Sequence, residues 1–180
     1  NGRIYAVEDI ATPESAKTPK NYVLLARDAF NGCELWRHPL KDWDKEKLGP
    51  VKIIPVQLQR LLVAVKDRVY CTDGFDGPVQ VFDGATGDVL TTFADTTNSR
   101  EIAYSEGVLY GIKGAPYAFR ARGREAEQLR ISDVTLYARD ATSGAALWQN
   151  VIKGSGKGGK EGYIGGTLSV RGDQLCYITR

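Results

Sequence analysis

Residues 24–36 read LLARDAFNGCELW, and the same pattern returns as VQVFDGATGDVLT at 79–91 and as LYARDATSGAALW at 136–148. The three segments align without gaps. Each has an aspartate, a glycine four residues later and a leucine three residues after the glycine: Asp28, Gly32 and Leu35; Asp83, Gly87 and Leu90; Asp140, Gly144 and Leu147. The aspartates are 55 and 57 residues apart. The chain therefore contains an internal repeat, which is typical of propellers and solenoids.

The repeated segment has the chemistry of a β-hairpin. Apolar residues alternate before each aspartate, as Leu24 and Ala26 do in the first copy, and alternation turns one face of a strand toward a core. The aspartate can accept backbone N–H groups across a turn, and the glycine supplies a positive φ where the chain reverses. Because the aspartate recurs wherever the turn recurs, we interpret Asp28, Asp83 and Asp140 as structural residues.

A second pattern alternates with the first: GRIYAV at 2–7, DRVYCT at 67–72, GVLYGI at 107–112 and DQLCYI at 173–178. The last three runs each follow another apolar run across a tight polar turn. The repeating unit therefore has four strands, which we call A, B, C and D. The chain reads B, C, D, then two full units, then A and B, which predicts 13 strands.

Four-stranded antiparallel units at this interval, joined by glycine-centred turns, favour a β-propeller over a sandwich or a closed barrel. We predict an all-β fold: a β-propeller fragment of four-stranded antiparallel blades, with about three to three and a half blades in a single partial propeller over 1–180. The blade pieces are expected at about 1–40, 61–94, 101–150 and 167–180. Both ends fall inside a unit and the chain begins at Asn1, so we expect it to be a piece of a longer protein.

The segments NGCELW, TGDVL and SGAALW, each after an aspartate and an alternating strand, resemble the blade motif of the pyrroloquinoline-quinone-like (quinoprotein dehydrogenase-like) β-propeller repeats. The resemblance covers nearly all of the chain. It implies that Trp36 and Trp148 pack between neighbouring blades. The middle repeat has Thr91 at that position, which suggests one degenerate junction between blades.

For function, the resemblance implies two classes and an extracytoplasmic location, periplasmic or secreted. Some members of the family are dehydrogenases that hold the quinone (PQQ) and Ca²⁺ on the propeller axis, and others are assembly lipoproteins or secreted proteins without a cofactor. The adjacent cysteine pair of the dehydrogenases is absent from this sequence, and no acidic cluster has the pattern of a Ca²⁺ site. We expect no cofactor in this segment, with PQQ and calcium as the alternative.

The composition excludes several other classes. The chain has 180 residues, 42% hydrophobic and 26% charged, as in an ordinary folded domain. A net charge of +2 does not favour a nucleic-acid partner, and no apolar run is long enough for a membrane span. Cys33, Cys71 and Cys176 are far apart and offer no zinc-site spacing, so we interpret them as buried free thiols. His38 has no nucleophile placed near it by a motif, and we interpret it as structural.

The long connections should all extend from one face. In an antiparallel meander the A–B and C–D turns lie at one edge, and the B–C and D–A connections lie at the other. Every long connection is of the second kind: residues 9–21, 41–60, 114–134 and 151–166. Since loops on a rigid scaffold commonly carry binding residues, we expect the functional site on this face.

These connections carry aromatic and basic side chains that could bind a carboxylate, a phosphate or a sugar: Trp43, Tyr117, Phe119, Arg120, Arg122, Arg124, Lys157 and Lys160. The alternative interpretation is a set of solvated surface excursions. The segment 154–160 has the glycine and lysine spacing of a phosphate-binding loop, but Glu161 stands in place of the required Ser or Thr, and a strand follows where a helix is needed. We interpret it as a flexible loop or lid.

The leading hypothesis is a non-catalytic propeller scaffold or binding module of a larger extracytoplasmic protein, which binds a protein or glycan through its long-loop face. Further blades of the same chain, or a second copy, would cover the ends of the fragment. The first alternative is part of a quinone-dependent dehydrogenase whose cofactor ligands lie mostly outside this segment. The second is a propeller fused to an unrelated enzyme.

Overall fold

The computed structural model describes residues 2–10, 21–40, 60–74, 76–114, 133–153, 167–172 and 174–178. Within these residues the chain forms 13 strands and the 3₁₀ helix η2 (Ala94–Thr96): β1 (Arg3–Asp9), β2 (Tyr22–Asp28), β3 (Glu34–Pro39), β4 (Leu62–Val65), β5 (Arg68–Thr72), β6 (Val79–Asp83), β7 (Val89–Phe93), β8 (Ser99–Ser105), β9 (Val108–Lys113), β10 (Val134–Asp140), β11 (Ala146–Ile152), β12 (Thr167–Arg171) and β13 (Gln174–Ile178).

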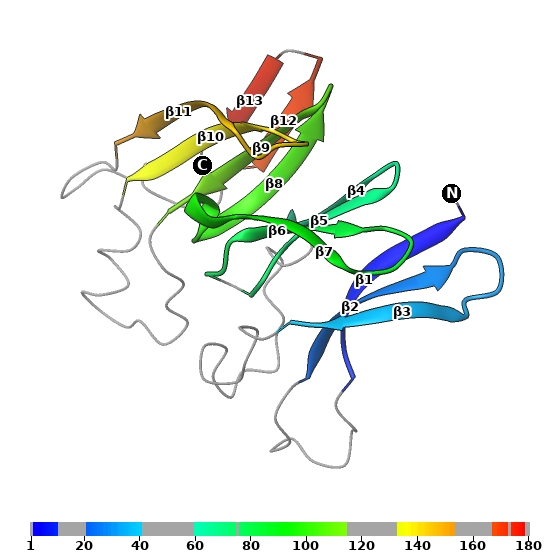
Figure 1. Ribbon diagram of the computed structural model, residues 1–180. Coiled ribbons are helices and arrows are strands. Elements are labelled where there is room, and N and C mark those ends of the chain that lie inside the picture. Colours follow the sequence, from blue (N-terminus) through cyan, green and yellow to red (C-terminus); the bar gives the residue numbers. More distant parts are fainter. Residues whose placement is uncertain are drawn as a thin grey trace.

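The strands form four antiparallel sheets that follow one another along the chain (Figure 1). Blade 1 contains β1–β3, blade 2 contains β4–β7, blade 3 contains β8–β11 and blade 4 contains β12–β13. Within each blade, every strand pairs with its neighbour in sequence. The expected all-β partial propeller is confirmed, and so is the predicted order of strands, from B, C and D in blade 1 to A and B in blade 4.

The repeated sequence produces a repeated backbone. In blades 1, 2 and 3 the hairpin between strands C and D has a β-bulge at the same place: Ala26/Arg27, Val81/Phe82 and Ala138/Arg139. The innermost strands also lie together, because β8 contacts both β4 and β12. The A–B turns of blades 2 and 3 are tight and use residues of positive φ, Lys66 and Glu106. The edge that carries these turns is therefore compact.

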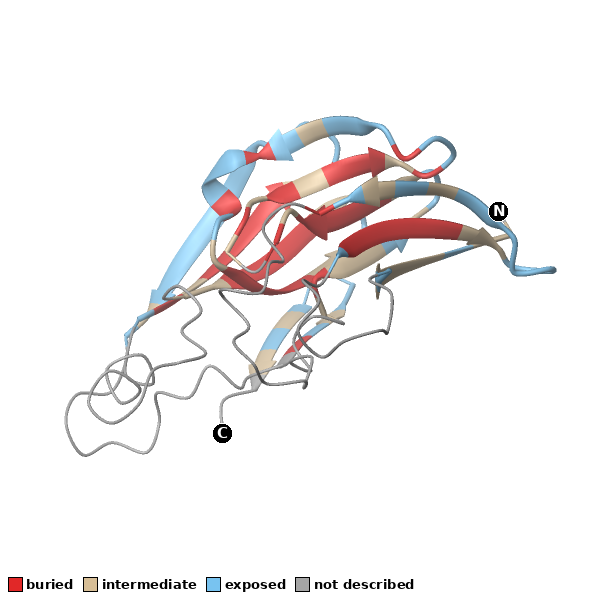
Figure 2. Cartoon of the chain, turned by 90° about the horizontal axis from the view of Figure 1, so that it is seen from below, coloured by how far each residue is buried: buried red, intermediate tan, exposed pale blue. Residues whose placement is uncertain are grey.

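Each blade buries its apolar face against the next blade. Leu24 of blade 1 packs with Val69 and Phe82 of blade 2, and all three side chains are fully buried. Two similar clusters join blade 2 to blade 3 and blade 3 to blade 4. Figure 2 shows the buried residues concentrated on middle strands of the blades, such as β2, β5, β9 and β10, with exposed residues on the outer strands β3, β7 and β11. Burying one side chain of this size contributes about 1.5–3 kcal/mol, so the stacking of blades is the main apolar contribution.

The cysteines correct one expectation. All three are free thiols, as predicted, but only Cys71 is buried, while Cys33 and Cys176 are exposed. Cys33 lies in the turn before β3, outside the alternating pattern of a strand. On β13 the neighbouring Leu175 and Tyr177 pack toward blade 3, so Cys176 lies on the opposite face.

Among the described residues, no helix has the length and apolar character that crossing a membrane requires.

Candidate functional site

The repeated aspartates organise the C–D turns. Asp28 Oδ1 accepts the backbone N–H groups of Phe30 and Asn31, at 2.8 and 3.1 Å. Asp83 and Asp140 accept the two equivalent N–H groups in their own turns, at distances between 2.7 and 3.0 Å. In the third copy, hydrogen bonds from Ser143 and then Thr142 lower the pKa of the Asp140 carboxyl. These carboxylates accept hydrogen bonds from their own turns and therefore have a structural role.

The junction of blades 1 and 2 depends on a close approach to a turn. Trp36 Nε1 and the Tyr5 hydroxyl both donate hydrogen bonds to the backbone oxygen of Gly84, at 3.1 and 3.0 Å. The indole also lies against Gly87, where an added Cβ would be 2.6 Å from the ring. Gly87 has a φ of +79°. Glycine is therefore required here both by the backbone conformation and by the tryptophan.

The junction of blades 2 and 3 repeats this arrangement with a different aromatic residue. The Tyr70 hydroxyl donates to the backbone oxygen of Ala141 at 2.9 Å, and Phe93 lies against Gly144. The sequence predicted a degenerate junction because Thr91 replaces the tryptophan. The structure shows a ring at this junction all the same, because Phe93, two residues further on the same face of β7, lies where the tryptophan ring lies in the first junction.

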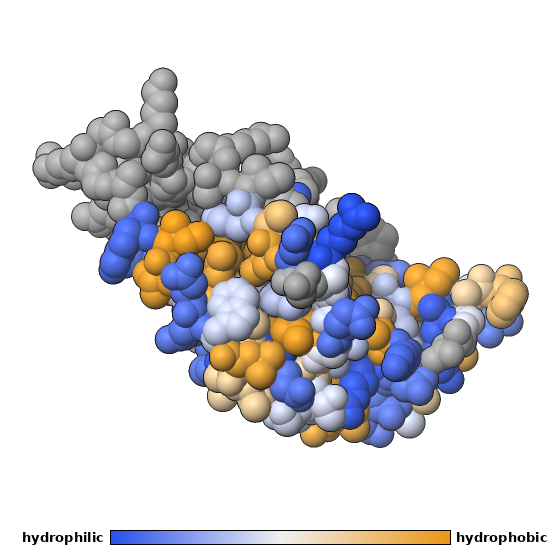
Figure 3. Space-filling model, turned by 90° about the horizontal axis from the view of Figure 1, so that it is seen from above, coloured by the Kyte–Doolittle hydropathy of each residue, from blue (hydrophilic) through white to orange (hydrophobic). Residues whose placement is uncertain are grey.

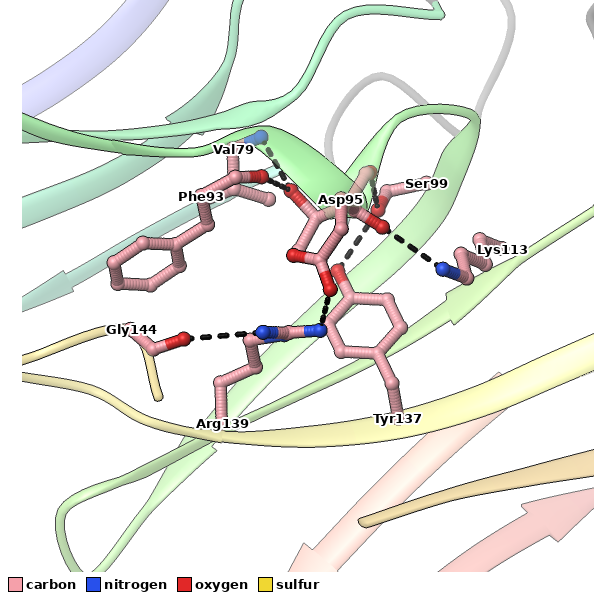
Figure 4. Close-up of polar contacts among 9 residues, drawn as sticks. Val79, Phe93, Asp95, Ser99, Lys113, Tyr137, Arg139 and Gly144 are labelled. Atoms are coloured by element: carbon pink, nitrogen blue, oxygen red, sulfur yellow. Dashed lines mark hydrogen bonds and ion pairs between the residues drawn. The ribbon is translucent and has the colours of Figure 1, made fainter. Parts of the chain in front are cut away.

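A polar network fastens the end of blade 2 to blade 3 (Figure 4). Asp95 in η2 forms an ion pair with Arg139, and its backbone oxygen accepts a hydrogen bond from Lys113 Nζ at 2.8 Å. The Tyr137 hydroxyl and Ser99 Oγ lie within hydrogen-bonding distance at 2.8 Å, and burial raises the pKa of Tyr137. The phenol is therefore neutral at physiological pH and acts as a structural hydrogen-bonding group.

Two further ion pairs lie beside the start of β8. Arg100 Nη1 is 3.2 Å from Asp76 Oδ1, and Arg60 Nη1 is 3.4 Å from Glu101 Oε2. Arg100 and Glu101 are buried. Burial raises the pKa of the Glu101 carboxyl, while a backbone hydrogen bond from Leu168 and the charge of Arg60 act in the opposite direction. Buried charges of this kind need partners, and each of these has one.

The predicted binding residues lie outside the described residues: Trp43, Tyr117, Phe119, Arg120, Arg122, Arg124, Lys157 and Lys160. The structure does describe the strand ends that border their segments. β3 ends at Pro39, β9 at Lys113 and β11 at Ile152. Because neighbouring strands are antiparallel, these ends belong to the edge opposite the A–B and C–D turns. The described strand ends therefore show from which edge of the sheets the long connections extend.

In the part of the chain that the structure describes, no group of three or more His, Cys, Asp and Glu side chains could hold a metal ion. His38 lies in β3 with its ring edge-on to Phe82, at a centroid distance of 4.9 Å. The described residues form a packed frame.

Sequence reasoning missed one set of residues that the structure uses. Tyr5 and Tyr70 each bond to the turn of the next blade, and Tyr110 has the same position in blade 3. The signal was present, since a tyrosine stands at the same place in three of the four B-strand runs. Those runs were interpreted only as strands.

Comparisons with known proteins were consistent with the fold. No protein-family model matches the chain, and no curated protein matches its sequence. Among solved structures, the chain is similar to the computationally designed Ika8 protein, with 15% identity and a TM-score of 0.50 over 96% of this chain and 42% of that one. Similarity to the acylaminoacyl peptidase of Pyrococcus horikoshii has 12% identity and a TM-score of 0.56, over 98% and 26% of the two chains. For the quinohemoprotein alcohol dehydrogenase of Comamonas testosteroni the identity is 17% and the TM-score 0.46, over 83% and 19%.

These similarities concern architecture. The chain spans less than half the length of each of the three structures. The four antiparallel sheets and the similarities to the designed Ika8 protein and the acylaminoacyl peptidase show an all-β, propeller-like fold.

Proposed function

We propose that this chain is a non-catalytic scaffold or binding module of a larger extracytoplasmic protein, with blades of the pyrroloquinoline-quinone-like repeat type, and that it binds a protein or glycan through its long-loop face. One observation carries the proposal. The described turns at one edge are tight, such as Asp83–Gly87 and Glu106–Gly107, whereas the long connections start and end at the opposite edge. Variable loops on a rigid frame are a common arrangement for recognition.

The chemistry of the loops supports this class of ligand. Residues 114–134 combine two aromatic residues with four arginines. Aromatic rings stack on sugar faces, and guanidinium groups bind carboxylates in a bidentate manner. An acidic glycan or an acidic protein surface would therefore suit the face.

The proposal is tested with two triple variants of the full chain on immobilised glycans, both neutral and acidic. Replacement of Tyr117, Arg120 and Arg122 by alanine should weaken capture by about tenfold or more. The matched control replaces Lys66, Glu106 and Arg171, at the tight-turn edge, and should leave capture unchanged. Equal losses in the two variants would contradict the assignment of the face.

The dehydrogenase alternative has its own readout. We expect that addition of PQQ and Ca²⁺ to the protein gives neither bound-quinone absorbance nor dye-linked alcohol oxidation. If both signals appear, the scaffold proposal is wrong and the chain belongs to a quinone-dependent oxidoreductase.

A further inference from the structure

The outer edge of blade 3 is open along β11. In the order β11-β10-β9-β8 this strand is outermost, and within the described part of the chain it pairs only with β10 (Figure 1). Its side chains from Ala146 to Val151 are all exposed. Figure 3 shows hydrophobic side chains at the surface seen from above, the side on which β11 and β13 lie in Figure 1. An outer strand of this kind presents N–H and C=O groups that can pair with another strand.

This edge belongs to the architecture of the blade and does not depend on where the sequence ends. Blade 3 contains all four of its strands, and β8 contacts β4 and β12, so β11 lies on the outside. Val151 pairs with Thr135, on the face of β10 from which Arg139 reaches blade 2, and it is 46% exposed although blade 2 is present. Leu90, the equivalent of Leu147, is 51% exposed between two described blades.

The outer strands of the three blades differ in how well they are protected from pairing. Charges, prolines and short length all block an edge strand. β3 contains the ion pair of Glu34 and Arg37 and ends at Pro39, and β7 has only five residues. β11 has seven residues, ALWQNVI, with neither a charge nor a proline. Its bulge lies at Leu147, so the regular stretch Trp148–Ile152 is an unprotected edge.

This regular stretch is complementary to itself. Its central residue is Asn150, and a twofold axis there places this residue opposite Asn150 of a second copy. Gln149 then lies opposite Val151. Trp148 lies opposite Ile152, which makes an apolar cross-strand pair. The two central amides can hydrogen-bond to each other, and no like charges meet. The uncharged edge therefore suits a second copy of the chain better than a partner recognised by its charge.

We propose that two copies of this chain associate through the outer edges of their β11 strands, which pair antiparallel about a twofold axis at Asn150. The two four-stranded blades then form one continuous sheet. The pairing covers about 17 Å of each strand. An interface this small is typical of weak complexes, so the Kd of the dimer lies in the micromolar range. The association does not depend on the function proposed for the long-loop face.

Sedimentation equilibrium of the full chain, from about 1 μM to about 1 mM, measures the association. The wild type should show a monomer–dimer equilibrium. Asn150→Lys and Asn150→Asp each place two like charges opposite each other across the axis, and each should raise the Kd at least about tenfold. An equimolar mixture of the two variants should form a heterodimer, because lysine then faces aspartate. Thr92→Lys, on the outer strand β7 of blade 2, is the matched control at an exposed position and should leave the Kd unchanged.

Recovery in the mixture separates the proposed pairing from a failure of the variants to fold, since misfolded chains would not recover. A wild type that stays monomeric over the whole range would overturn the proposal. Dimers that persist in both single variants would also overturn it, because the association would then use another surface. The same holds if the mixture does not recover, or if Thr92→Lys weakens the dimer as much as Asn150→Lys does.

Discussion

At the scale of single residues, the three thiols differ only in their surroundings. Cys71 is fully buried, and burial raises its pKa to about 12. Its thiol therefore stays neutral and inaccessible at about pH 8, whereas Cys33 and Cys176 are exposed. We predict that a thiol reagent at that pH labels two cysteines in the native protein and the third only after denaturation, as measured by mass spectrometry.

The variant Cys71→Ala provides the control. It should take up two labels before denaturation and two after it. Rapid labelling of all three thiols in the native wild-type protein would show that the core between blades 1 and 2 is open, contrary to the structure.

At the scale of elements, Gly32 and Gly87 form a matched pair. Both have positive φ, +74° and +79°, in equivalent turns. A Cβ at Gly32 would meet nothing within 4 Å, whereas one at Gly87 would be 2.6 Å from the Trp36 ring. An alanine at either position would have a strained backbone, because both have positive φ. Only an alanine at Gly87 would also collide with the Trp36 ring.

We therefore predict that Gly87→Ala lowers the free energy of unfolding by about 1–3 kcal/mol more than Gly32→Ala does. Urea denaturation measures the difference. Tryptophan fluorescence should also shift to longer wavelength in Gly87→Ala alone, because the indole is displaced toward solvent. Equal destabilisation by the two substitutions would indicate that Trp36 does not pack on the turn in solution.

The same elements show how far the sequence alone could lead. The order of strands was predictable because the Asp and Gly of the turn occur at the same positions in three aligned segments, and each copy contains the residues that its own turn requires. Phe93 was not predictable by alignment, since the ring moved two residues along β7 while staying on the same face. Cys176 was misjudged because its burial depends on which face of β13 meets blade 3, a tertiary fact.

The site was less predictable than the fold. The strand ends that border the long connections could be derived from topology, because antiparallel pairing places them at one edge. The binding residues proposed within those connections, such as Arg120 and Trp43, lie outside the described residues, so they remain predictions. Loop conformation has no repeat to fix it, and the choice of ligand depends on that conformation.

At the scale of the whole molecule, Glu101 marks the place where three blades meet. It belongs to β8 of blade 3, pairs with Arg60 just before blade 2 begins, and accepts a backbone hydrogen bond from Leu168 of blade 4. The pKa of Tyr177 is raised by burial and, to a smaller extent, by the charge of Glu101. The protonation of this one carboxyl is therefore coupled to the stacking of blades.

The sign of that coupling follows from the raised pKa of Glu101. An unfolded chain releases this proton near pH 4.5, the ordinary value, and the folded chain holds it to higher pH. Folding thus takes up a proton in this window, and the contribution of Glu101 to stability falls as the pH rises toward its folded pKa. Above that pKa the contribution is constant. Glu101→Gln keeps an oxygen for the Leu168 N–H group but has no proton to lose.

We predict that the free energy of unfolding of Glu101→Gln increases relative to that of the wild type as the pH rises from about 4 to about 7. Urea denaturation at intervals across this range measures the difference between the two proteins, in which the titration of shared groups such as Asp140 cancels. Lys153→Ala, which breaks an exposed ion pair with Asp133, is the control and should differ from wild type by a nearly constant amount. A pH-independent difference for Glu101→Gln would mean that the carboxyl is solvated, and that blades 3 and 4 do not close over it as the structure has them.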